Sequence, residues 1–239
     1  MAVIEAFGED GEQTFSSDYP ALSLLQRGRV QAVYNGNELN YEAGFSFVGQ
    51  AILPMVFYRP EALGRYIGSR FIREVNGKLA GYGLTCHVPV SGGTYVGAEG
   101  FFNYAVFTGY VIEGTGDVGL QTWSESGELT FDSRSKCLKV LKVIRRQDWN
   151  LLRTERFPSA DRIRYVYTAA LPQGAEYFYA DGQYMGTEGF FGFILNYLGF
   201  ESSRSVLTMM FTRRISQMND PPLSSLKFPI ILAGAVTGD

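Results

Sequence analysis

The chain has 239 residues and a nearly balanced set of charges, 21 Lys and Arg against 24 Asp and Glu, so its formal net charge is −3. This balance gives no electrostatic reason to expect a nucleic acid or an anionic membrane as partner, and we expect neither. The length fits two domains of about 115–120 residues better than one.

The composition predicts an all-β protein. It includes 18 Phe and 15 Tyr, which favour strands, and 28 Gly, which favour turns. We therefore expect two tandem, related β-sandwich domains of jelly-roll-like type, at residues 1–116 and 117–239. The boundary is placed at Gly114–Gly116, because a second copy of the opening hairpin begins just after this Gly-rich stretch.

Cysteine and histidine usage gives no sign of a disulfide framework or a zinc site. Cys86 and Cys137 lack CxxC spacing, and His87 is the only histidine. We expect no metal and no cofactor. The N-terminus lacks a signal-peptide pattern, and the longest apolar stretch, 228–236, is too short to cross a bilayer. We therefore expect no membrane insertion, and a chain made in a reducing cytoplasm.

The chain opens with one predicted hairpin, residues 7–17, and repeats it at residues 122–133. Each has strand-type residues around a Gly turn and is followed by a leucine-rich strand. At an offset of 116 positions, 8 of the 19 residues in 7–25 are identical to those in 123–141. We infer two copies of one motif, neither of which carries catalytic side chains.

Between the hairpins, two Asn-Gly pairs predict tight turns. Asn35-Gly36 follows a strand signal at 30–34, and Asn76-Gly77 joins 70–75 to 78–88 in a long ribbon. In the second half, residues 147–156 form the only segment that could be a short helix, with a long loop as the alternative.

Four features could carry chemistry but favour simpler interpretations. Glu99 and Glu188 occupy equivalent places in a repeated Gly-x-Glu-Gly-Phe-Phe segment and could act as an acid and base pair on a glycosidic bond. Exposed turn residues are the favoured interpretation. Cys86 and His87 are neighbours on a predicted strand, so they point to opposite faces and cannot form a nucleophile pair. The Gly-x-Gly stretches lack a phosphate-loop context, and the Arg doublets are typical of solvated strand faces.

Tyrosine clusters are the better binding candidates. A tyrosine buries area while keeping a polar tip, which suits cores, subunit interfaces and sugar-stacking platforms. We consider core packing first, a subunit interface second and a ligand platform third. The candidate residues are Tyr104, Tyr110, Tyr177, Tyr179 and Tyr184.

Residues 120–141 carry a resemblance to a known family. They read Leu-Gln-Thr-Trp-Ser-Glu-Ser-Gly-Glu-Leu-Thr-Phe-Asp-Ser-Arg-Ser-Lys-Cys-Leu-Lys-Val-Leu. This segment resembles minor tail proteins of long-tailed phages and prophages, with Trp123 where those proteins have Phe or Tyr. The resemblance is close over 119–143 and weaker over 3–19, which is roughly a sixth of the chain.

The resemblance implies a structural, non-enzymatic virion protein at the tail tip, assembled in the host cytoplasm. It implies a β-sandwich build, a homo-oligomer around the tail axis, contacts with other tail proteins and a contribution to host attachment. The alternative is a glycan-binding module that recognises a host-surface receptor by stacking on Tyr or Trp. A third hypothesis is a glycan-degrading enzyme that uses Glu99 and Glu188.

Overall fold

The computed structural model describes residues 5–7, 13–16, 22–34, 36, 41–50, 54–76, 78–180, 195–214 and 231–236. These residues form β-strands joined by turns and three single-turn 3₁₀ helices, so the all-β prediction is confirmed. The strands are β1 (Glu5–Phe7), β2 (Gln13–Ser16), β3 (Ser23–Tyr34), β4 (Tyr41–Gln50), β5 (Met55–Pro60), β6 (Arg65–Val75), β7 (Lys78–Pro89), β8 (Tyr95–Gly97), β9 (Gly100–Thr108), β10 (Gln121–Trp123), β11 (Leu129–Asp132), β12 (Leu138–Ile144), β13 (Asn150–Phe157), β14 (Arg162–Ala170), β15 (Tyr177–Ala180), β16 (Leu195–Phe200), β17 (Val206–Arg214) and β18 (Ile231–Val236).

The predicted helix or loop at residues 147–156 is wrong. A single 3₁₀ turn, Arg146–Asp148, leads directly into β13, which pairs with β14 over its whole length. Local propensity is ambiguous in this segment, and the cross-strand ladder decides its conformation. Pro158 then begins the 3₁₀ turn Pro158–Ala160 that follows the strand.

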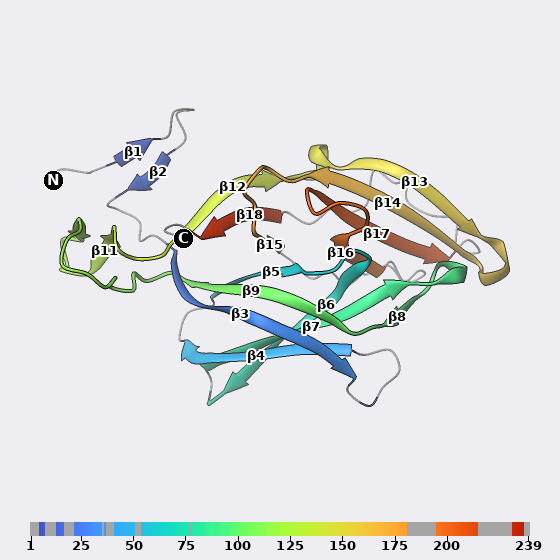
Figure 1. The fold of residues 1–239 in the computed structure, drawn as a ribbon, viewed down its shortest axis with the longest axis horizontal. Coiled ribbons are helices and arrows are strands. Elements are labelled where there is room, and N and C mark those ends of the chain that lie inside the picture. The colour runs from blue at the N-terminus through green and yellow to red at the C-terminus, as the bar shows by residue number, and fades with distance from the viewer. Residues whose placement is uncertain are drawn as a thin grey trace.

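The main strands form two antiparallel layers. One layer has the order β12-β18-β15-β5-β9-β3, and the other has the order β4-β7-β6-β16-β17-β14-β13, with β8 added beside β7. Strands β3 and β4 join the layers through two residue pairs, Val33 with Glu42 and Tyr34 with Tyr41. Figure 1 shows β3, β9 and β5 crossing the middle of the molecule, β13, β14 and β17 at one end, and the two small hairpins at the other.

The two layers pack face to face as a β-sandwich. The ring of Phe45 on β4 stacks on that of Tyr104 on β9, with centroids 3.8 Å apart. One cluster of buried side chains includes Phe102 from the first layer and Leu84 and Phe200 from the second. Among the described residues, many aromatic side chains are thus used in the core between the layers.

Strands from both halves of the chain share each layer. β15 pairs with β5 through Phe178 and Tyr58, and β16 pairs with β6, where Gly199 lies opposite Tyr66. The predicted boundary between residues 116 and 117 falls in the connection from β9 to β10 and does not separate the sheets. The division of the chain into two domains stays a prediction.

The strand order is the one expected of two halves related by an approximate two-fold axis. In the first layer, the order β3-β9-β5 from one edge corresponds to the order β12-β18-β15 from the other edge. In the second layer, the corresponding strands β6 and β16 are neighbours. Leu22 and Leu138, which are equivalent at the 116-residue offset, meet directly, because the Leu138 amide donates to the Leu22 carbonyl oxygen at 2.9 Å. β14 departs from this two-fold correspondence, because it lies between β13 and β17, whereas β4 and β7 are direct neighbours.

Both predicted hairpins are confirmed as separate two-stranded sheets, β1–β2 and β10–β11. Gly127 adopts a φ of 81° in the turn of the second hairpin, a conformation that favours glycine. The Asn76-Gly77 prediction is also confirmed, since Val75 pairs with Lys78. The connection after Tyr34 is longer than a two-residue turn, because Tyr34 pairs with Tyr41.

Candidate functional site

The predicted tyrosines do not form one platform in the described structure. Tyr104 is a core residue, only 6% exposed, and Gln26 Nε2 donates to its hydroxyl oxygen at 2.7 Å. Its face is covered by Phe45. Tyr104 is therefore not available to stack on an external ligand.

The other four tyrosines lie elsewhere. Tyr110 is 43% exposed and follows the end of β9. Tyr177 and Tyr179 lie on β15, opposite Gly234 and Leu232 of β18. Tyr184 lies outside the described residues. A ligand platform at these positions stays a prediction.

The proposed carboxylate pair is described only in part. Glu99 is exposed in the turn between β8 and β9, and its backbone carbonyl accepts a 2.7 Å hydrogen bond from Arg65 Nε. Glu188 lies outside the described residues, so the distance between the carboxylates stays untested.

Cys86 and His87 do not interact as a nucleophile and its base. Cys86 is fully buried in the core, and burial raises the pKa of its thiol to about 12. His87 Nε2 lies 2.9 Å from Thr85 Oγ1, and burial lowers the pKa of the imidazole to about 4. A protonated thiol beside a neutral imidazole gives no activated nucleophile at neutral pH. No cluster of three metal-ligating side chains occurs among the described residues.

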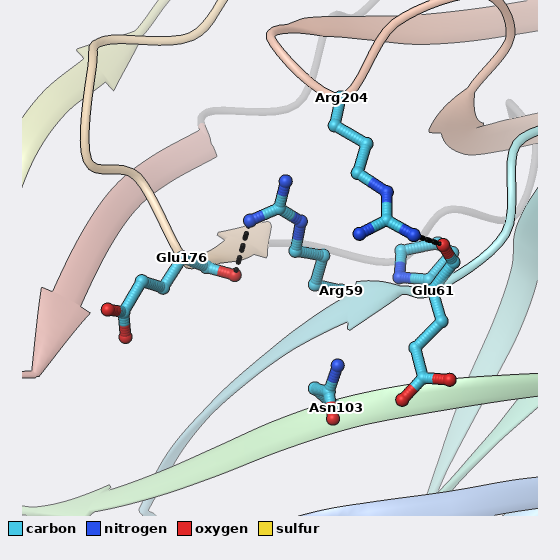
Figure 2. Close-up of a pocket in the computed structure, with 6 residues that line it drawn as sticks. Arg59, Glu61, Asn103, Glu176 and Arg204 are labelled. Atoms are coloured by element: carbon cyan, nitrogen blue, oxygen red, sulfur yellow. Dashed lines mark hydrogen bonds between the residues drawn. The ribbon is translucent and has the colours of Figure 1, made fainter.

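One polar pocket lies where the two halves meet (Figure 2). Its cavity volume is about 220 Å³, and its lining comes from β5, β9 and the turns before β15 and after β16: Arg59, Pro60, Glu61, Asn103, Glu176 and Arg204. Pockets at the junction of structural units are frequent ligand sites, so its chemistry matters.

The side chains of this pocket mainly tie the chain together. Arg29 binds Glu61 through two hydrogen bonds of 2.6 and 2.8 Å, and this guanidinium lowers the pKa of the Glu61 carboxyl. Arg204 donates to the Glu61 backbone oxygen, and Arg59 donates to the Ala175 backbone oxygen at 3.1 Å. Guanidinium groups keep their protons, and an ionised Glu61 is a poor acid, so Arg59, Arg204 and Glu61 can bind polar groups but do not form a proton-transfer pair among themselves.

The segment 113–134, here called the hairpin lobe, contains the motif that carries the family resemblance. Asp132 is buried, and its carboxylate accepts hydrogen bonds from the Arg134 amide and Nε at 2.9 Å and from Nη2 at 2.7 Å. Gln121 Nε2 and the Gly114 amide donate to the same carboxylate. The Arg134 guanidinium, foremost among these donors, holds the pKa of Asp132 well below its usual range.

Arg134 extends this clasp across the lobe. Its Nη1 donates to the Gly116 carbonyl oxygen at 2.7 Å, while the Leu120 amide donates to Ser133 Oγ at 2.8 Å. A Cβ atom added at Gly114 or Gly119 would lie 2.4 or 2.7 Å from Arg134. The Phe-Asp-Ser-Arg motif is therefore a structural clasp. In the first copy, Ser16 and Asp18 stand at the positions of Asp132 and Arg134.

The clasped lobe exposes large apolar side chains that sequence reasoning did not select. Val118 is 90% exposed, and Leu120 and Trp123 are each 56% exposed. Their sequence context could have indicated this exposure, because these residues lie beside glycines and a Ser-Gly turn and not within a long strand. An exposed Trp on a rigid support is typical of an interaction surface.

No protein family, curated protein or solved structure matches this chain. No helix in the described residues is long and apolar enough to cross a membrane.

Proposed function

We propose that this chain is a structural component of the tail tip of a long-tailed bacteriophage, a minor tail protein that contributes to host attachment. It assembles with copies of itself around the tail axis and with other tail proteins, and it reaches the virion from the host cytoplasm. The observation that carries the proposal is the clasped lobe, which holds Val118, Leu120 and Trp123 in solvent. Rigidly held, exposed apolar residues of this kind are suited to burial in an assembly.

Two further observations support a structural role over an enzymatic one. Asp132, Ser133 and Arg134, in the motif that resembles minor tail proteins, are engaged in hydrogen bonds within the lobe. Three ionisable side chains of the junction pocket, Arg59, Glu61 and Arg204, are engaged in contacts between strands and turns. We infer that the chain is not an enzyme; degradation of host polysaccharide by the purified chain, abolished by Glu99→Gln, would overturn that inference.

Antibody labelling of purified virions tests the proposed location. We expect label at the distal end of the tail, and particles made without this chain to lack complete tail tips. Normal, infectious tails from a deletion mutant, or virions that carry no label, would show that the chain is not a tail-tip component.

A glycan-binding module is the second candidate, because Trp123 and Tyr110 expose 56% and 43% of their surface. Stacking of a sugar on either ring requires such exposure. Binding to host polysaccharide should then fall at least about tenfold in Trp123→Ala or Tyr110→Ala. Tyr179→Ala and Tyr184→Ala test the other predicted positions, and Leu63→Ala, which truncates an exposed apolar residue elsewhere, is the control. Absence of polysaccharide binding by the unaltered chain would eliminate this candidate.

A further inference from the structure

Charges of opposite sign are separated along the chain around the hairpin lobe. Residues 113–132 include five acidic side chains and no basic one: Glu113, Asp117, Glu125, Glu128 and Asp132. Residues 134–146 include six basic side chains and no acidic one: Arg134, Lys136, Lys139, Lys142, Arg145 and Arg146. Asp132 and Arg134 pair within the clasp, but the other four acidic residues are exposed. The lobe is therefore an acidic surface next to a basic strand.

The basic strand lies at the open end of the strand path. In the described part of the chain, β12 forms its ladder only with β18, and β13 forms its ladder only with β14. The outer edge of β12 is occupied only at its start, where Cys137 forms an isolated bridge with Ser23 and the Leu138 amide donates to the Leu22 carbonyl oxygen. Figure 1 shows β12 and β13 following one another along one margin of the molecule, here called the open rim. The outer backbone groups of such edge strands are a template for pairing with another chain.

The open rim also exposes apolar side chains. Val140 and Val143 on β12 are 42% and 37% exposed, and Leu151 and Leu152 on β13 are 48% and 55% exposed. A bulge between Val140 and Lys142 adds one residue, so Val140 and Val143 return to the same side of the strand. The rim thus combines apolar side chains with the exposed cations Lys139 and Arg145.

The lobe and the rim match each other in sign and in apolar content, but they are not placed to meet within one molecule. The bonds from Arg134 to Asp132 and to the Gly116 carbonyl hold the lobe together internally, and Figure 1 shows β11 of the lobe at one end of the molecule. Figure 1 shows β12 running from that end toward the opposite one. The acidic lobe would repel a second lobe, so the complementary surface that the molecule offers is the rim of another copy.

We propose that the hairpin lobe of one molecule docks onto the open rim of a second copy of this chain, with Trp123 as the apolar anchor. The two surfaces differ, so the contact is head-to-tail, and repetition of such a contact closes a ring when the rotation between neighbours allows. This inference deepens the proposed role as an assembling tail-tip protein and rests on it.

Charge reversal tests the docking directly. One variant carries Glu125→Lys with Glu128→Lys on the lobe, and another carries Lys139→Glu with Arg145→Glu on the rim. Each should weaken self-association of the full chain by at least about tenfold, measured by sedimentation at tens of micromolar and low salt. A chain with all four changes should regain association, and so should an equimolar mixture of the two variants. Trp123→Ala should lose association without a change in melting temperature.

Glu74→Lys, which reverses an exposed acidic residue outside the lobe, is the control and should associate like the unaltered chain. The proposal fails if the lobe or rim variant associates normally, if the fourfold variant melts normally but stays dissociated, or if the unaltered chain is a monomer. Virion labelling separates this result from the proposed function. Labelled tails from a monomeric chain would overturn the docking alone, and a self-associating chain absent from virions would overturn the tail-tip role alone.

Discussion

At the scale of single residues, His87 couples folding to pH. Burial lowers the pKa of its imidazole to about 4, whereas an unfolded chain keeps a value near 6.5. Between these values the unfolded state binds a proton that the folded state does not. The stability of the fold therefore decreases as the pH falls from about 6.5 toward 4. Above about pH 6.5, the contribution of His87 to the stability does not change with pH.

We expect the unaltered chain to lose up to about 2 kcal/mol more unfolding free energy between about pH 7 and pH 5 than His87→Gln loses. Urea unfolding of both proteins at the two pH values measures the difference. Carboxyl groups contribute equally to both proteins, so the comparison isolates this side chain, the only histidine in the chain. Identical pH dependence in the two proteins would contradict the lowered pKa of the half-buried His87 imidazole.

Truncation of Tyr104 should destabilise the protein strongly, whereas truncation of Tyr110 should leave its stability almost unchanged. Tyr104→Ala removes a buried ring stacked on Phe45 and should cost about 3–5 kcal/mol of stability. Tyr104→Phe keeps the ring, loses the bond from Gln26 and should cost about 1 kcal/mol. Tyr110→Ala, at an exposed site, should stay within about 0.5 kcal/mol of the unaltered chain. Denaturant unfolding ranks the three variants, and an unaffected Tyr104→Ala would contradict its place in the core.

At the scale of elements, the hairpin lobe depends on its clasp. A two-stranded hairpin is marginal by itself, so β10 and β11 need the bonds that converge on Asp132. Because the pKa of Asp132 is lowered in the fold, its contribution is present above the ordinary aspartate pKa. That contribution is lost as the pH falls from the ordinary aspartate pKa through the lowered pKa of Asp132.

Asp132→Asn should open the lobe locally without unfolding the sandwich. The charge-assisted bonds to Arg134 are lost, and a local cost of about 2 kcal/mol corresponds to about 30-fold faster exchange of lobe amides. The amides of Ser124 and Ser133, which bond to Glu128 and Leu120, report this opening in hydrogen-exchange measurements. Asp117→Asn removes an exposed charge of the same lobe and should leave exchange unchanged. Unchanged exchange in Asp132→Asn would show that the clasp is dispensable.

At the scale of the whole molecule, the two halves are held together by strand pairing as well as by the core. β5 pairs with β15 and β6 pairs with β16, and Arg59 and Arg204 of the junction pocket add bonds across the same region. Sheets shared in this way favour unfolding as one cooperative unit.

Gly199→Ala should weaken this junction. A Cβ atom there would lie 2.2 Å from the Arg65 carbonyl oxygen, and neither backbone can withdraw without losing the pairing of β16 with β6. We expect a loss of about 1–3 kcal/mol in a single unfolding transition. Gly109→Ala, where no atom lies within 4 Å of the added Cβ, should be nearly neutral and serves as the control. Two separate transitions would instead support independent domains at residues 1–116 and 117–239.

The sequence by itself determined the all-β class, the two hairpin copies and the tight turn at Asn76-Gly77. These features depend on neighbours along the chain, such as alternation of side chains and the positive φ that glycine and asparagine tolerate. The same local rules left residues 147–156 ambiguous. Their strand conformation comes from the ladder with β14, a contact made by distant residues.

Only the tertiary structure decided which aromatic residues are buried and which strands meet across the two halves. Tyr104 and Trp123 both lie on strands, yet Tyr104 is covered by Phe45 of the other layer while Trp123 lies on a separate two-stranded sheet that exposes it. A pattern of alternation shows that one face of a strand is suited to burial but does not say which neighbour covers it. The pairing of β5 with β15 and of β6 with β16 is decided in the same way, by long-range contacts that no local pattern encodes.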